Sequence, residues 1–144
     1  MRQTRNRSRG TVVAARMTTG HQITIIPADV HVEVTLGGQT LAASDRAVIL
    51  HETGLPARYY IPCDDVRTDL LRPTARQTTC PFKGDASYWS AQVGDEVHED
   101  LVWSYQAPIP SAAAIAGLMC FYSERVELTV GGTHQPGTQA STRQ

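Results

Sequence analysis

The sequence has little of what stabilises small secreted or zinc-dependent domains. Its 144 residues include only three cysteines, Cys63, Cys80 and Cys120, and no CxxC pair. An odd number of separated cysteines argues against a fully paired disulfide framework and against a four-thiolate zinc site. A single core at this length buries about two thirds of the unfolded surface, so neither device is required. The sequence therefore predicts one domain in a reducing compartment, the cytoplasm, with no metal and no cofactor.

Long apolar runs and the common catalytic signatures are missing as well. No apolar run reaches the roughly 18 residues of a membrane helix, and no secretory signal is recognised, so we expect no membrane partner. The motifs G-x-x-x-x-G-K-[ST], G-x-G-x-x-G and G-x-S-x-G do not occur. His51-Glu52 lacks the second histidine of H-E-x-x-H, which excludes that type of metalloprotease.

Charge is distributed unevenly along a chain whose net charge is -1. Residues 1–16 contain five arginines and no acid, whereas residues 17–130 contain all 14 acidic residues. Such an arginine block is typically solvated, and an acidic body repels polyanions, so we expect no specific nucleic-acid partner. We predict a disordered basic head at 1–20, a folded domain at 21–130 and a disordered tail at 131–144.

Alternation of apolar and polar side chains dominates the predicted domain. Residues 32–36 alternate, meet Gly37-Gly38, and the pattern resumes at 39–42, which favours a tight hairpin because both central residues of a type I′ turn need a positive φ. A short helix is predicted from Asp64-Asp65 to a stop at Pro73. Further short strands are predicted at 23–25, 47–50, 58–61, 86–93, 97–105, 118–122 and 126–130. About nine short strands and one short helix indicate a mainly β domain.

Three large aromatic residues fall on the longest predicted hairpin. Trp103 and Tyr105 are two residues apart on one strand and so share a face. Counting outward from the turn at 94–95 places Trp89 opposite Asp100. These rings are a candidate slot for a flat or cationic ligand, and the alternative is that they form the core of the sheet.

A second set of candidate residues surrounds a predicted turn between Cys80 and Gly84. The turn would bring the ammonium group of Lys83 close to Cys80 and favour its thiolate, a requirement for a nucleophile. The alternative is that Cys80 is a buried apolar residue. Glu52 follows an apolar strand at a position suited to a cleft mouth, and the alternative is a salt bridge with Arg46 or Arg58.

Several of these segments carry a resemblance to a known family. They are residues 41–47, His51-Glu52-Thr53-Gly54-Leu55-Pro56, Tyr59-Tyr60-Ile61-Pro62, Asp65-Val66, the CPFKGDASYWS stretch at 80–90, Trp103-Ser104-Tyr105 with Pro108, and Phe121-Tyr122. In this order they closely resemble the bacterial domain-of-unknown-function family numbered 427, over about residues 23–130.

The resemblance implies a single β-tent-like domain, similar to the thalidomide-binding domain of cereblon and to methionine sulfoxide reductase B. Many of those relatives hold zinc with paired CxxC motifs, which this chain lacks, so zinc is not carried over. The family is sometimes labelled a nucleotidyltransferase, but the Gly-Ser plus paired-acid pattern of such enzymes is absent.

Three functional hypotheses follow. The favoured one is a domain that binds a small molecule in a slot lined by aromatic residues, with polar anchors beside them. The ligand-binding residues are Tyr60, Trp89, Trp103 and Tyr105. The anchors are Glu52, Lys83 and Cys80. The second is an enzyme with Cys80 as nucleophile, Lys83 stabilising its thiolate and Glu52 handling protons. The third is a non-catalytic interaction module. It would use the basic head or the acidic tip of the longest predicted hairpin, which consists of Asp95, Glu96, Glu99 and Asp100. The oligomeric state and the ligand's identity do not follow from the sequence.

Overall fold

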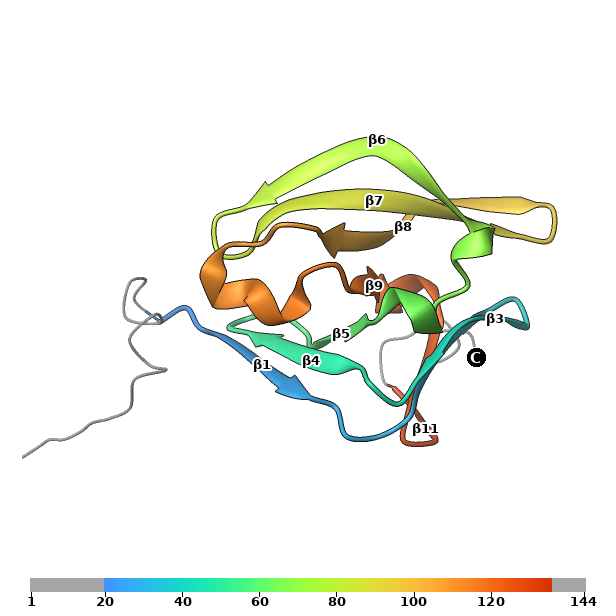
Figure 1. The fold of residues 1–144 in the computed structure, drawn as a ribbon. Helices are drawn as coiled ribbons and strands as arrows, with labels where there is room; N and C mark the ends of the chain where they lie inside the picture. The colour runs from blue at the N-terminus through green and yellow to red at the C-terminus, as the bar shows by residue number, and fades with distance from the viewer. Residues whose placement is uncertain (1–19, 136–144) are drawn as a thin grey trace, which may run out of the picture.

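The computed structural model describes residues 20–135, and most of them lie in two antiparallel sheets (Figure 1). In order across the sheet, the seven strands of the larger one are β1 (Ile23–Pro27), β4 (Val48–Glu52), β5 (Arg58–Ile61), β9 (Met119–Phe121), β8 (Glu96–Tyr105), β7 (Gly84–Val93) and β6 (Leu71–Cys80). The four strands of the smaller one are β11 (Thr133–His134), β10 (Glu127–Val130), β2 (Val32–Leu36) and β3 (Gln39–Ser44). The predicted mainly β fold is confirmed.

The main hydrophobic core lies between the two sheets. Every second residue of β2 is buried, so the smaller sheet gives one face to this core. The larger sheet also gives one face, with side chains that include Ile61, Val102 and Phe121. Because successive side chains of a strand point to opposite faces, their neighbours in sequence lie on the far side of the larger sheet. There they form a second apolar cluster, which includes Tyr60, Trp103 and Cys120.

The turn between β2 and β3 has the backbone that the sequence predicts. Gly37 and Gly38 have φ angles of 57° and 83°, which a residue with a Cβ rarely adopts. The two glycines therefore permit the tight hairpin whose strands contribute to the main core.

The predicted helix after Asp64 is wrong. The chain instead makes two short 3₁₀ turns, η1 (Cys63–Asp65) and η2 (Thr68–Leu70), and then enters β6 at Leu71. β6 is the last strand of the larger sheet and is largely exposed, so it has no apolar alternation by which the sequence would reveal it. Pro73 does not end an element but lies within this edge strand, where its missing N–H is tolerated.

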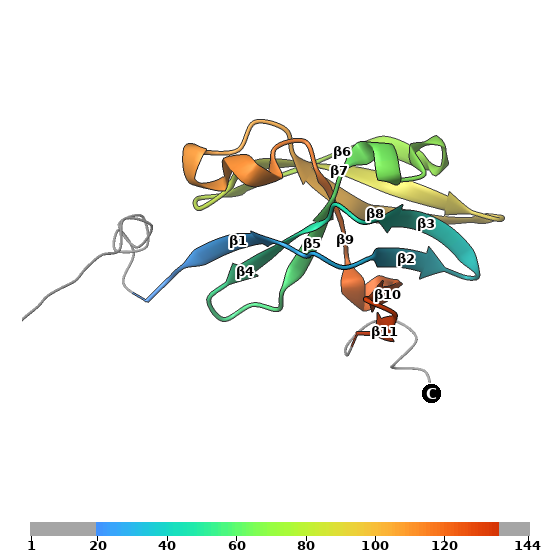
Figure 2. The same cartoon turned by 60° about the horizontal axis from the view of Figure 1, so that its bottom comes forward.

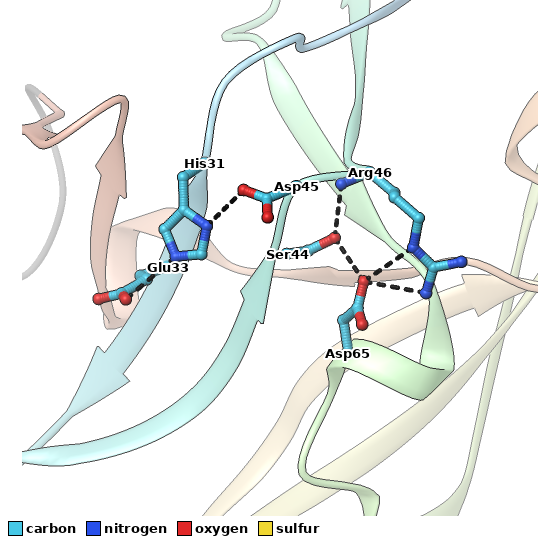
Figure 3. Close-up of polar contacts among 6 residues, drawn as sticks. All are labelled: His31, Glu33, Ser44, Asp45, Arg46 and Asp65. Atoms are coloured by element: carbon cyan, nitrogen blue, oxygen red, sulfur yellow. Dashed lines mark hydrogen bonds and ion pairs between the residues drawn. The ribbon is translucent and has the colours of Figure 1, made fainter.

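Polar contacts attach η1 to the end of β3 (Figure 3). The hydroxyl of Ser44 donates a hydrogen bond to the carboxylate of Asp65 at 2.6 Å and accepts one from the backbone N–H of Arg46 at 2.9 Å. The Arg46 guanidinium donates to the same carboxylate at 3.1 Å. The hydrogen bond from Ser44, together with that from Arg46, lowers the pKa of Asp65. Arg46 is therefore paired with Asp65. The salt bridge between Arg46 and Glu52 that the sequence offered as an alternative is not formed.

The predicted register of the hairpin formed by β7 and β8 is wrong beyond its first few pairs. Ala91 lies opposite His98 as counted from the turn, but a register shift then places Trp89 opposite Val102 and not opposite Asp100. At this bulge Asp100 has a φ of 51°, and its backbone N–H donates to the Ser90 hydroxyl at 3.1 Å. The shift is of two residues, so it leaves the faces unchanged: Trp89 shares the core face with Ala91 and Val102, and it packs half-buried against the main core.

The larger sheet is strongly bent about β9. Figure 2 shows two wings that diverge from it, one with β1, β4 and β5 and the other with β6, β7 and β8. The segment η3 (Pro110–Ile115), orange in Figure 1, lies between the wings and buries Ala112 and Ile115 in the second apolar cluster. The bend gives this face of the sheet a concave shape.

The described part of the chain extends past the predicted end of the domain at residue 130. Gly131-Gly132 forms a turn, and Thr133–His134 pairs with Thr129 and Val130. The predicted basic head, apart from Gly20, and the predicted tail from residue 136 onward lie outside the described residues. Between residues 20 and 135 the structure contains no helix long and apolar enough to cross a bilayer.

Candidate functional site

A cavity of about 210 Å³ opens on the concave face of the larger sheet. Behind it, a row of residues runs directly across four neighbouring strands: Tyr60 on β5, Cys120 on β9, Trp103 on β8 and Tyr88 on β7. The three aromatic members of this row line the cavity, and Cys120 is fully buried. Tyr105 and Tyr122 add two further aromatic walls, and Leu50, Leu55 and Pro56 add apolar ones.

An ion pair is buried in the cavity wall. The carboxylate of Glu52, at the end of β4, accepts a hydrogen bond from the Lys83 ammonium at 2.5 Å on Oε1. Its other oxygen, Oε2, is 2.9 Å from Nε2 of His21. The side chains of Glu52 and Lys83 are only 7% and 11% exposed. Removing either charge would therefore leave the other buried without its partner.

The position of Lys83 depends on a close approach between two loops. Its backbone N–H donates to the carbonyl of Cys80 at 3.2 Å, and its own carbonyl accepts from the N–H of Ile109 at 2.9 Å. The next residue, Gly84, has a φ of 119°, and a Cβ there would lie 3.2 Å from the Cα of Pro108. Glycine is required here, because it allows the 107–109 segment to hold the turn that carries Lys83.

The second cation of the cavity is Arg58, which shares a face of β5 with Tyr60. Its guanidinium lies over the rings of Trp103, at 5.2 Å from the centroid, and Tyr122, at 5.8 Å. It also donates two hydrogen bonds to the carboxylate of Glu124, at 2.9 and 3.0 Å. Burial alone would lower the pKa of Arg58, but the bonds to Glu124 raise it overall, so the side chain stays charged.

The two rings at the centre of the cavity are held by a hydrogen bond. The indole Nε1–H of Trp103 donates to the Tyr60 hydroxyl at 3.0 Å, and the ring planes are almost perpendicular, at 85°. Burial raises the pKa of Tyr60 and also that of Tyr105. Both phenols are therefore neutral at physiological pH and keep their O–H donors.

The structure brings together five of the seven predicted site residues. Those that line the cavity are Glu52, Tyr60, Lys83, Trp103 and Tyr105. Trp89 does not, because alternation along β7 puts it on the core face with Ala91 and Val102, opposite to the face of Trp103. Its neighbour Tyr88 lines the cavity instead.

Cys80, the predicted nucleophile, is also not part of the cavity wall. It is half-buried and packs beside the second apolar cluster. The ammonium of Lys83 binds Glu52 and lies 5.8 Å from the centroid of the Tyr105 ring, and within residues 20–135 it makes no hydrogen bond to the Cys80 thiol. His51 is exposed, in contrast to the buried Glu52 beside it.

Besides the apolar wall residues, four polar or aromatic residues of the site were not among the predicted ones. Arg58 could have been found, since its spacing of two from Tyr60 on one short strand puts both on one face. Alternation along β7 puts Tyr88 on the face of Trp103, and only its position directly opposite Trp103 depends on the register shift. His21 and Tyr122 reach the site only through the folding of the larger sheet, and His21 is held by stacking on Phe82 at 3.8 Å between ring centroids.

The described residues offer binding groups but no metal-ligating cluster. Between residues 20 and 135, no group of three or more His, Cys, Asp or Glu side chains is placed to hold a metal ion. The cavity wall contains rings, two cations and one carboxylate, and no serine, threonine, cysteine or histidine. Such a wall is suited to holding a compound with an apolar body and a polar group.

Comparison with models of known sequence families assigns most of the chain to a family. A sequence model of a family with the short name NTP_transf_9, described as a domain of unknown function (DUF427), matches residues 24–132, which is more than half of the chain. This range includes every residue of the cavity wall. No curated protein matches the chain.

Proposed function

Since the chain belongs to the DUF427 family, whose function is unknown, we propose a function from its own geometry: the protein binds a small molecule in the cavity on the concave face. Tyr60, Trp103 and Tyr105 form the walls, and Glu52 and Lys83 are the polar anchors.

One observation carries this proposal: a charged pair is held in a hollow among aromatic rings. Side chains of an ordinary core are apolar, because a buried charge costs free energy unless it is paired. Here Lys83 and Glu52 are almost fully buried and yet line a cavity, as does Arg58. A few polar groups in an otherwise apolar hollow are typical of small-molecule sites.

Binding is favoured over covalent catalysis by the residues of the wall. A nucleophilic mechanism needs a hydroxyl or thiol within hydrogen-bond reach of a base. The only hydroxyls in the wall belong to tyrosines, and the Cys80 thiol lies outside it. The wall therefore supports recognition of a ligand more directly than attack on one.

Thermal unfolding in the presence of a library of small polar metabolites tests the proposal. A compound that binds the folded state stabilises it by about 2.7 kcal/mol at a hundredfold excess over its Kd. The two tryptophans provide a matched pair of variants, since Trp103 lines the cavity and Trp89 does not. We expect Trp103→Ala to abolish the stabilisation and Trp89→Phe to retain it.

The same pair gives a direct optical signal. In the Trp89→Phe variant Trp103 is the remaining tryptophan, so a bound compound should change its emission in a saturable way. The proposal fails if no compound stabilises the protein, or if the stabilising compounds act equally on the Trp103→Ala and Trp89→Phe variants.

A further inference from the structure

The cavity has hydrogen-bond donors without acceptors. An ammonium group has three N–H donors, and among the described residues the one acceptor of Lys83 is Glu52. Two donors of a side chain that is 11% exposed thus have no protein partner between residues 20 and 135. Because donors of a largely buried group are nearly always paired with protein, water or a ligand, these two can bind a group that enters the cavity.

Two phenols add to this excess. Tyr105 is 6% exposed, lines the cavity, and its hydroxyl has no hydrogen bond within residues 20–135. The Tyr60 hydroxyl accepts from Trp103, but its own O–H reaches no acceptor in that part of the chain. The pKa of each phenol is raised, chiefly by burial, so both remain donors at neutral pH.

The acceptors of the wall are already engaged. Each oxygen of Glu52 is in contact with a nitrogen, Oε1 with Lys83 and Oε2 with His21. Arg58 is paired with Glu124 outside the wall, so the preference for a negatively charged ligand comes from the free N–H donors of Lys83.

The aromatic faces are occupied by the protein's own cations. Arg58 lies over Trp103 and Tyr122, and Lys83 lies 5.8 Å from the centroid of Tyr105. An aromatic cage that recognises a cationic ligand needs these faces free. The cationic ligand that the sequence left open is therefore disfavoured.

We propose that the ligand is a small organic acid whose carboxylate accepts hydrogen bonds from Lys83 and Tyr105. This inference rests on the proposed function. The apolar part of the acid packs against Leu50, Leu55 and Pro56, which an inorganic anion would leave uncovered. The cavity of about 210 Å³ is smaller than the roughly 300 Å³ at which sites for drug-sized ligands begin, so the acid is small.

Four probes of similar or smaller size test this charge preference: benzoate, benzamide, benzylamine and inorganic phosphate. Binding is followed by Trp103 emission in the Trp89→Phe variant. We expect benzoate to bind at least about tenfold more tightly than the other three, because only it offers both a carboxylate and an apolar body.

Variants of that protein identify the donors. Tyr105→Phe keeps the ring and removes the hydroxyl, and we expect it to weaken benzoate binding severalfold. The double variant Glu52→Gln with Lys83→Met removes the ion pair without leaving a lone buried charge, and we expect it to abolish the preference for benzoate over benzamide. Arg72→Met is the matched control, because it removes a cation from an exposed position on β6, outside the cavity wall.

The outcomes separate this inference from the proposed function. Equal or tighter binding of benzamide, benzylamine or phosphate overturns the organic acid and leaves binding in the cavity intact. The inference is also overturned if Arg72→Met weakens benzoate binding as much as the Glu52→Gln, Lys83→Met double variant does. Overall charge would then explain the effect. If none of the four probes changes the Trp103 emission, the organic acid is rejected, and the proposed function is rejected only if the metabolite library fails as well.

Discussion

The hydroxyl of Tyr60 is 3.0 Å from the indole nitrogen of Trp103, and both residues are buried, at 1% and 7% exposed. Tyr60→Phe would leave the indole N–H without a partner, and we expect it to lower the free energy of unfolding by about 1–3 kcal/mol. Urea denaturation measures this change. Tyr59→Phe is the control, because the Tyr59 hydroxyl has no hydrogen bond within residues 20–135, and its effect should stay within about 0.5 kcal/mol. Equal effects of the two variants would contradict a stabilising role for the hydrogen bond between Trp103 and Tyr60.

The three thiols differ in access, which makes their reactivity a second test at the level of single residues. Cys120 is fully buried, and burial raises its pKa, so we expect no labelling by a thiol reagent until the protein unfolds. Cys63 is exposed and Cys80 half-buried, so we expect both to be labelled in the folded protein. Mass spectrometry of quenched samples locates the label. Much faster labelling of Cys80 than of Cys63 would support the nucleophile hypothesis.

Residue positions also show where sequence reasoning fails. The sequence places Trp89 and Trp103 correctly on one hairpin, but counting from the turn already sets Trp89 opposite Asp100, on the face away from Trp103. The shift at Ser90 and Asp100 is of two residues, so it keeps the faces and brings Tyr88 directly opposite Trp103. No feature of the sequence alone indicates that Asp100 adopts a positive φ.

Among the structural elements, the turn between β6 and β7 is the one on which the site depends most. At Gly84, alanine would place its Cβ 3.2 Å from a backbone atom of Pro108. Gly94, in the turn between β7 and β8, also has a positive φ but faces open space. We expect Gly94→Ala to cost about 1–2 kcal/mol and Gly84→Ala at least about 1 kcal/mol more. Thermal unfolding compares the two, and equal losses would show that the approach of the 107–109 segment is unimportant.

The contacts of His31 bring the start of β2 and the end of β3 together and predict a pH dependence. Its hydrogen bond to Asp45 at 2.7 Å and its hydrogen bond to Glu33 at 3.1 Å raise the pKa of His31 above 6.5 (Figure 3). Because the folded pKa is the higher one, any stabilisation is complete below pH 6.5 and is lost as the pH rises through the folded value. We expect an NMR titration of the imidazole to show this raised midpoint.

Asp45→Asn is the matched variant for His31. It removes the partner with the larger effect and should lower the midpoint of the titration. Added salt should act in the same direction, since the imidazole is exposed and its ion pairs are screened. A midpoint unchanged by the substitution would contradict the role given to Asp45.

Element by element, the sequence predicts strands well where one face is buried. The pattern of β2 and the Gly37-Gly38 turn follow directly from period two and from the need for positive φ. β6 escapes detection because an edge strand exposed along most of its length has no apolar period to detect. The predicted helix before it is wrong because Val66 is extended, with φ -112° and ψ 141°, and separates η1 from η2.

At the scale of the whole molecule, the ion pair of Glu52 and Lys83 connects the two wings of the larger sheet. Glu52 lies on β4, the second strand in order across the sheet, whereas Lys83 lies in the turn after β6, the last. The two residues are 31 positions apart in the sequence. Their meeting depends on strand order and on the bend at β9, neither of which local patterns encode.

This connection predicts a strongly non-additive pair of substitutions. Lys83→Met leaves a buried carboxylate without its main partner, and we expect a loss of about 3–5 kcal/mol of stability. Adding Glu52→Gln should recover a large part of that loss, because no buried charge is then left unpaired. Urea denaturation of both single variants and the double variant measures the coupling. Additive effects would show that the two wings are held by other contacts.

The outer strands of the larger sheet affect how copies of the protein can associate. A bare strand edge is a template on which a second polypeptide can extend a sheet, the first step toward fibrils. Here Pro27 ends β1, and Pro73 with the flanking charges of Arg72 and Arg76 interrupts β6. Each outer strand of the larger sheet thus lacks an N–H that an incoming strand would need, so edge-to-edge growth from this sheet should be disfavoured.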